Sequence, residues 1–190
     1  RRYQIQKVWR GERPQEGRYR EFTQADIDII GRDTLPFHHE VEVALVMAEV
    51  FAELPIPTAV IKVNNRKLAE GFFRGAGATD PDAALRALDK LDKAGPEAVR
   101  DLLVGEAGLD AVGADRCLQL AAVTGTDRSI VERVRALGVE HPLLEEGLDE
   151  LVAVVEAANA RRPGSVVADL KIARGLDYYT GVVYETTVDG

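Results

Sequence analysis

The sequence is poor in cysteine and histidine. Cys117 is the single cysteine, so no disulfide can form within the chain. Two of the three histidines, His38 and His39, are adjacent, which is not the ligand spacing of a structural zinc site. We therefore expect neither a disulfide scaffold nor a metal ion bound by the protein itself.

Long apolar runs are also missing. No segment approaches the roughly 20 consecutive apolar residues that a membrane helix requires, and the basic, polar start lacks the apolar region of a secretory signal. Hydrophobic residues make up 46% and charged residues 29% of the sequence, which is typical of an ordinary folded protein. These features predict a cytoplasmic protein that does not enter a membrane.

Basic residues are in deficit. The chain has 24 lysines and arginines against 32 aspartates and glutamates, so its net charge is −8 and it is not suited to coating nucleic acid non-specifically. The first 20 residues reverse this balance with Arg1, Arg2, Lys7, Arg10, Arg13, Arg18 and Arg20 against Glu12 and Glu16. We therefore expect any phosphate chemistry at this end of the chain.

The N-terminal region has the alternation of two strands. Residues 3–10 and 21–30 both show a period of two, and a polar connection with Pro14 and Gly17 separates them. Hairpin loops usually have about two to five residues, whereas this connection spans residues 11–20. The pattern predicts an antiparallel hairpin with a long, functional, arginine-rich loop.

The rest of the chain combines helices with further strands. A helix is predicted over residues 36–54 and a strand over 58–64. Residues 66–163 show helical patterns alone, and the helices that we predict there are 81–93 behind a Thr79-Asp80 cap, 96–104, 110–123, 127–137 and 142–160. We place Cys117 on one of them as a buried residue.

Strand patterns return at residues 165–173 and 178–188. We expect the sheet that begins at residue 3 to resume there. The sequence thus predicts an α+β fold, a mixed antiparallel sheet with flanking helices, interrupted by an all-helical insertion. The predicted divisions are residues 1–65, 66–163 and 164–190.

The second strand of the hairpin has two different faces. Side chains two residues apart share a face, so Phe22, Gln24, Asp26 and Asp28 lie on one side, and Ala25, Ile27 and Ile29 lie on the other. The apolar side is predicted to face the core. For an isolated strand the simplest interpretation of the polar side is a solvated surface, but the adjoining loop suggests a binding site.

Residues 9–31 read WRGERPQEGRYREFTQADIDIIG. This segment closely resembles motif 2 of class II aminoacyl-tRNA synthetases, in the form found in histidyl-tRNA synthetases. The resemblance implies that Arg10 contacts the α-phosphate of ATP and the histidine carboxylate, and that Gln24 holds the α-amino group. It also assigns ATP binding to Glu12, Arg18, Tyr19 and Phe22. Asp28 takes the place of a glutamate that reads the imidazole in many bacterial members, and a carboxylate suits that role because an imidazole N–H donates to it.

Residues 174–181 read RGLDYYTG and lead into a strand pattern. Taken alone they indicate a glycine-containing turn before an aromatic strand, but they also resemble the histidine-specific motif of the same family. The resemblance implies that Arg174 is a catalytic arginine on the α-phosphate, and that Tyr178 and Tyr179 line the histidine pocket. Two family motifs in the right order, on either side of a helical insertion, make a chance match improbable.

The resemblance implies an activity and its partners. Histidine and ATP would form histidyl-adenylate, with Mg²⁺ on the ATP phosphates, and the histidyl group would pass to tRNA(His). Two always-charged guanidiniums suit a reaction in which negative charge develops on phosphate oxygens. The insertion would approach the tRNA acceptor stem, and the candidate contacts are Arg66, Lys67, Arg74, Arg161 and Arg162. For each of these residues a solvated surface position is the simpler interpretation.

Family members also have a motif 1 with the dimer interface, a motif 3 and an anticodon-binding domain. None is recognisable in this sequence, so we expect it to be a partial catalytic region that is inactive alone and belongs to a homodimeric enzyme. An alternative is the non-catalytic synthetase paralogue that serves as regulatory subunit of ATP phosphoribosyltransferase, although such paralogues lose parts of the catalytic motifs. A plain RNA-binding module is a weaker alternative, because the chain lacks an aromatic platform and a basic charge.

Overall fold

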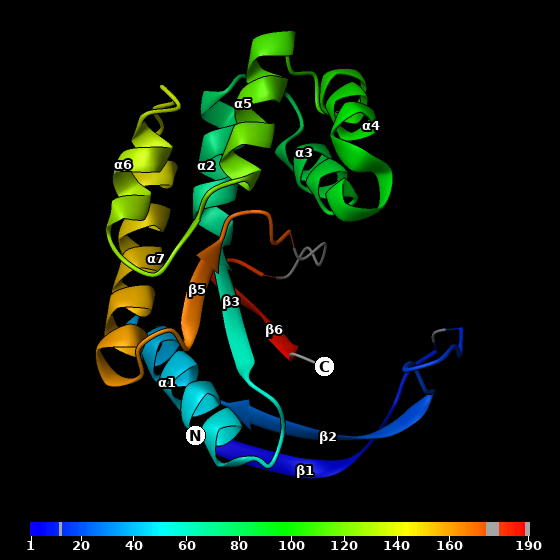
Figure 1. Cartoon of the computed structure of the whole chain (residues 1–190), viewed down its shortest axis with the longest axis vertical. Coiled ribbons are helices and arrows are strands. Elements are labelled where there is room, and N and C mark those ends of the chain that lie inside the picture. The colour runs from blue at the N-terminus through cyan, green and yellow to red at the C-terminus, as the bar shows by residue number, and fades with distance from the viewer. Residues whose placement is uncertain (12, 174–178, 189–190) are drawn as a thin grey trace. The chain divides into compact units, whose positions relative to one another are not determined.

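A computed structural model describes residues 1–11, 13–173 and 179–188 (Figure 1). The chain divides into two compact units, Arg1–His39 and Glu40–Gly190. The structure defines each unit by itself. Of the predicted site residues, Glu12, Arg174 and Tyr178 lie outside the described residues.

The first unit is the predicted hairpin. Strands β1 (Arg2–Trp9) and β2 (Glu21–Asp28) pair in antiparallel fashion over their whole length, with Arg2 opposite Asp28 and Trp9 opposite Glu21 (Figure 1). Each strand ends within two residues of its predicted limit. The long connection is therefore confirmed as the loop of a hairpin.

The prediction that the odd-numbered face of β2 packs in a core is wrong for Ala25 and Ile27, which are exposed. Their partners across the hairpin are Ile5 and Tyr3, and the exposed fractions of Tyr3, Ile5 and Ile27 are 77%, 68% and 44%. Alternation shows which side chains share a face, but burial also requires a second layer over that face. The described part of this unit is a two-stranded hairpin and supplies no such layer.

The second unit contains a mixed four-stranded sheet in the order β4-β5-β3-β6. Strand β3 (Ala59–Asn65) pairs in parallel with β5 (Val166–Asp169) and antiparallel with β6 (Val182–Val188), and β4 is Thr124–Gly125. The return of strands after the helical stretch is confirmed. The expectation of one continuous sheet from residue 3 is wrong, because the described strands form two separate sheets.

Seven helices are present in the described residues: α1 (His38–Glu53), α2 (Arg66–Gly75), α3 (Pro81–Leu88), α4 (Leu91–Gly105), α5 (Ala111–Ala121), α6 (Ser129–Arg135) and α7 (Pro142–Arg161). The predicted helix 81–93 is in fact two helices. The next break lies inside α4, where Gly95 has a φ of 81°. Helix α2 is not among the predicted helices, and the short strand β4 departs from the all-helical prediction for residues 66–163.

Side-chain caps fix the starts of several helices. Asp80 accepts a hydrogen bond from the Ala83 N–H at 2.9 Å, and Asp110 accepts one from the Gly113 N–H at 2.7 Å. These bonds satisfy N–H groups that have no partner within the first turn of a helix. The predicted cap at Asp80 is confirmed, and α7 begins at Pro142 as predicted. Among the described residues, no helix is long and apolar enough to cross a membrane.

Helices α2 and α7 pack closely against each other (Figure 1). Large side chains from both are fully buried, including Leu68 and Phe72 of α2 and Leu148 of α7. The close packing of the two helices requires glycine at position 71, because a Cβ there would lie 2.3 Å from the Leu144 backbone nitrogen. Since the contacted atom is backbone, no side-chain rotation can relieve the overlap.

Gly71→Ala is therefore expected to lower the free energy of unfolding by about 2 kcal/mol or more, because the two helices must separate. The matched control is Gly105→Ala at the end of α4, where a Cβ would meet nothing within 4 Å. We expect the control to be neutral or to stabilise by up to about 1 kcal/mol. Urea unfolding followed by circular dichroism measures both, and equal effects of the two variants would contradict the packing argument.

Cys117 lies on α5 and is fully buried, as predicted. Burial raises the pKa of its thiol to about 12, because the charged thiolate is not solvated there. Between pH 9 and about 12 the thiol is ionised in the unfolded chain but stays neutral in the folded chain. The free energy of unfolding therefore keeps its full value below about pH 9 and falls as the pH rises from about 9 to about 12.

We therefore expect Cys117 to be unreactive towards a disulfide reagent in the folded chain at pH 8. Thiolate is the reactive species, so the reaction should be complete only after unfolding in guanidinium chloride. Absorbance of the released thiolate measures both rates. Rapid reaction of the folded chain at pH 8 would contradict the buried position.

Candidate functional site

The even-numbered residues of β2 form one polar face of the hairpin. Phe22, Gln24, Asp26 and Asp28 are all half-buried, whereas the odd-numbered residues of the strand are exposed. Their partners on β1 are Val8, Gln6, Gln4 and Arg2 in that order. The predicted grouping of these side chains on one face is therefore present in the structure.

Arg10 joins this face just beyond the end of β1. Its backbone N–H donates to the Arg20 carbonyl at 2.8 Å, which extends the hairpin pairing. Its Nη2 donates to Oε1 of Gln24 at 3.3 Å, and its guanidinium lies 5.0 Å from the centre of the Phe22 ring. The structure thus places together three residues with predicted roles: Arg10 as a phosphate ligand, Phe22 as an ATP-binding residue and Gln24 as an amine ligand.

Gln24 has a second contact on the other side of its amide. Its Nε2 donates to Oδ2 of Asp26. Arg10, Gln24 and Asp26 therefore form a chain of hydrogen bonds along the face. Asp26 was not predicted as a site residue, although its spacing of two residues from both Gln24 and Asp28 already placed it on this face.

Asp28 lies at the far end of the same row. Its Oδ2 accepts a hydrogen bond from the Arg2 Nε at 2.7 Å, and the two side chains are 41% and 65% exposed. An ion pair with this exposure is weak and is readily exchanged for a ligand. The carboxylate is therefore accessible to a donor such as an imidazole N–H.

The loop of the hairpin contains a tight turn. The backbones of Gln15 and Arg18 exchange hydrogen bonds of 3.1 and 2.8 Å, and Gly17 has a φ of 75° that suits glycine. Arg18 closes this turn, Tyr19 follows it, and both side chains are exposed. Arg18 and Tyr19, the two described residues of the loop that are predicted to bind ATP, are thus exposed to solvent.

Of the second motif, the structure describes Tyr179 among the predicted site residues, and it is half-buried just before β6. The chain that follows is anchored at two points. The Arg66 N–H donates to the Gly181 carbonyl at 2.8 Å, and the Tyr184 hydroxyl donates to the Glu40 carbonyl at 2.9 Å. Burial raises the pKa of both Glu40 and Tyr184.

The candidate tRNA contacts all have acidic neighbours. The ion pairs are Arg66 with Asp82, Lys67 with Glu146 and Glu150, Arg74 with Glu70, and both Arg161 and Arg162 with Glu49. Lys67 donates hydrogen bonds to Glu146 and Glu150, and these bonds raise the pKa of its ammonium group. These pairs favour the simpler interpretation, in which the basic residues form ion pairs on the solvated surface of the second unit.

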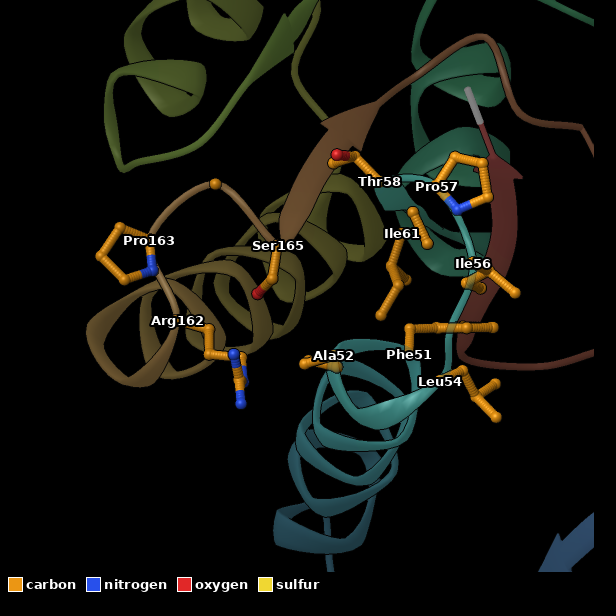
Figure 2. A pocket seen from close by; sticks show the side chains of 13 residues that line it. Phe51, Ala52, Leu54, Ile56, Pro57, Thr58, Ile61, Arg162, Pro163 and Ser165 are labelled. Carbon is orange, nitrogen blue, oxygen red and sulfur yellow. The ribbon is translucent and has the colours of Figure 1, made fainter. Parts of the chain in front are cut away.

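A cavity of about 330 Å³ lies between the end of α1, the segment leading into β3 and the turn before β5, and Figure 2 shows the side chains that line it. Phe51 and Ile61 contribute to its apolar wall. Arg162 Nε and Ser165 Oγ, on two of the lining residues, have no hydrogen-bond partner among the described residues. Both atoms are buried, so a ligand in the cavity could not reach them. None of the described residues that are predicted to bind histidine or ATP lines this cavity, so it is not the predicted substrate pocket.

The chain is similar to known proteins along its whole length. The family described as Histidyl-tRNA synthetase matches residues 1–190. A histidine–tRNA ligase from Cutibacterium acnes is 60% identical over 194 residues, which cover the whole chain and 43% of that protein. The chain thus spans less than half the length of this relative.

The chain is also similar to solved structures over almost its whole length. The crystal structure of histidyl-tRNA synthetase from Nostoc sp. PCC 7120 matches 98% of the chain and 43% of its own, with a TM-score of 0.85 and 30% sequence identity. An ATP phosphoribosyltransferase regulatory subunit/histidyl-tRNA synthetase from Bacillus halodurans covers 97% of the chain and 47% of its own, with a TM-score of 0.79. Its identity of 20% shows a common fold alone.

Proposed function

Because the chain belongs to the histidyl-tRNA synthetase family, we propose that the protein containing it is a histidine–tRNA ligase. The reaction would activate histidine with ATP and transfer it to tRNA(His). The observation that carries the proposal is the polar face of the hairpin, where Arg10 contacts both Phe22 and Gln24. These are residues that the motif resemblance assigns to the two substrates.

The proposed chemistry needs positioned positive charge. The histidine carboxylate would attack the α-phosphorus of ATP, and the bond from that phosphorus to pyrophosphate would break. Arg10 would hold the carboxylate and an α-phosphate oxygen, and Arg174 would bind the same phosphate from the second motif. No general base is required for this step, because a carboxylate is already ionised at neutral pH.

Each substrate has its own set of proposed ligands. Histidine would contact Arg10 through its carboxylate, Gln24 through its amine and Asp28 through its imidazole, between Tyr178 and Tyr179. The proposed ligands of ATP, besides the two arginines, are Glu12, Arg18, Tyr19 and Phe22. An imidazole N–H donates to a carboxylate. A side chain without such a donor would leave Asp28 unpaired, and its binding would be weaker by about 1 to 3 kcal/mol.

Mg²⁺ is proposed to arrive with ATP, because it binds phosphate oxygens and keeps several waters. The described residues contain no group of three or more acidic, histidine or cysteine side chains that could hold a metal ion by themselves. We therefore treat the ion as part of the nucleotide substrate. It adds positive charge on the outer phosphates.

The division of the chain follows from the same proposal. Residues 1–65 and 164–190 would belong to a class II catalytic core, and residues 66–163 would form a helical insertion domain that approaches tRNA. The complete protein would be a homodimer and would act in the cytoplasm, where tRNA is charged.

The regulatory alternative is less well supported. The likeness to the Bacillus halodurans structure concerns the fold, whereas the Cutibacterium acnes ligase shares 60% of the residues. The hairpin also keeps Arg10, Phe22 and Gln24 in contact. A regulatory subunit would bind histidine without histidine-dependent exchange of pyrophosphate into ATP, so that exchange distinguishes the two functions.

We expect the chain to bind histidine selectively in a calorimetric titration, and ATP to change that affinity. Asp28→Ala should weaken histidine binding by about tenfold or more, since the imidazole N–H loses a charged acceptor. Asp28→Glu should retain most of the affinity, because it keeps the carboxylate. The control is Glu21→Gln, which removes the same charge from the opposite face of the strand.

Circular dichroism must first show that each variant is folded. Equal histidine affinity of Asp28→Ala and the unchanged chain would contradict the assignment of Asp28. If the chain does not bind histidine, the titration and the pyrophosphate exchange are repeated on the protein extended at both ends to the length of its relatives. An extended protein without histidine-dependent exchange would overturn the proposed function.

A further inference from the structure

The side-chain amide of Gln24 lies between two groups of opposite hydrogen-bonding character. Arg10 donates to its oxygen at 3.3 Å, and its nitrogen donates to Asp26. A guanidinium can only donate, and an ionised carboxylate can only accept. Turning the amide over would set N–H against N–H at Arg10 and oxygen against oxygen at Asp26, so one orientation alone satisfies both contacts.

We propose that Asp26 is a positioning residue, which holds the Gln24 amide with its oxygen towards Arg10 and so presents an acceptor to the α-ammonium group of the substrate. This inference rests on the proposed function, in which Arg10 binds the substrate carboxylate. The carboxylate and the ammonium group of an amino acid are attached to the same carbon atom. An acceptor 3.3 Å from the guanidinium is therefore well placed for the ammonium group.

The oxygen of Gln24 can serve two donors at once. A carbonyl oxygen has two lone pairs, and Arg10 uses one of them in the structure. When the substrate carboxylate takes up donors of Arg10, the contact between Arg10 and Gln24 is weakened. The bond to Asp26 then remains to keep the amide from turning over and offering its NH₂ group to a cation.

The neighbouring carboxylate does not replace Asp26 in this role. Asp28 shares the face, but its Oδ2 accepts from Arg2 at 2.7 Å at the far end of the row. Gln4 and Gln6, which lie across from Asp26 and Gln24 on β1, are neutral. Of the described contacts of Gln24, the bond to Asp26 is the one with a negative partner.

The first experiment tests the orientation without any substrate. In ¹⁵N NMR of the full chain, hydrogen exchange of the Gln24 side-chain NH₂ is compared with that of Gln6, which is exposed on the paired strand. The Gln24 signal is assigned by its loss in Gln24→Met. We expect its exchange to be about tenfold slower than that of Gln6 and to rise to the Gln6 rate in Asp26→Ala.

Asp26→Asn separates the hydrogen bond from the charge. The amide oxygen that this substitution introduces can still accept from Gln24, so slow exchange should persist in the variant. Exchange of the Gln24 NH₂ at the Gln6 rate in the unchanged chain would overturn the proposed orientation, whatever the protein binds. Slow exchange that persists in Asp26→Ala would overturn the role of Asp26.

The second experiment tests the consequence for the substrate. Affinities for histidine and for 3-(imidazol-4-yl)propionate, which lacks the amino group, are measured for each variant after its fold is verified. We expect Asp26→Ala to reduce the preference for histidine by about tenfold, and Asp26→Asn to reduce it by no more than about threefold. Glu21→Gln, which alters the opposite face of β2, should leave the preference unchanged.

The outcomes distinguish the two proposals. If the unchanged chain prefers histidine and Asp26→Ala prefers it by the same factor, the positioning role is wrong while the proposed function stands. If neither the chain nor the extended protein distinguishes histidine from its deamino analogue, the proposed function fails, and with it the role of the amide towards an ammonium group. The exchange measurement still decides the orientation of Gln24 in that case.

Discussion

Two adjacent buried asparagines at the end of β3 tie the second unit together. Asn64 donates from Nδ2 to the carbonyls of Leu170 and Ile172 at 3.3 and 2.9 Å. Asn65 caps α2 with its oxygen and donates to Glu150 on α7 at 2.7 Å. A buried amide that loses its partners costs about 1 to 3 kcal/mol. The end of one strand therefore fixes two helices and the segment that leads into the second motif, and these parts depend on one another.

This arrangement bears on the proposed chemistry. The second motif begins directly after the segment that Asn64 holds, and its far side is fixed where Gly181 accepts from the Arg66 N–H. A reaction that depends on placed charges rather than on proton transfer needs ligands with fixed positions. Hydrogen bonds thus hold the described residues on both sides of the second motif to the second unit.

The arrangement of side chains on the hairpin follows from the pairing of β1 with β2. The antiparallel register places Arg2 opposite Asp28 and Gln6 opposite Gln24, and side chains along one strand are brought together by their spacing of two residues. Neighbours on one face can then form a chain of hydrogen bonds without a second layer. The same geometry leaves the apolar face of the hairpin exposed, which the alternation of the sequence alone did not reveal.

The sequence by itself determined the features that depend on neighbouring residues. The hairpin strands, the shared face of Gln24 and Asp28, and the cap at Asp80 all follow from contacts within a few positions or from a period of two. The tertiary structure alone decided that residues 61–63 pair in parallel with 166–168 and that residues 59–65 pair antiparallel with 182–188. It also decided that β1 and β2 form a sheet of their own, and which acidic residues neutralise the basic surface. These outcomes depend on which distant segments meet, and local periodicity carries no information about that.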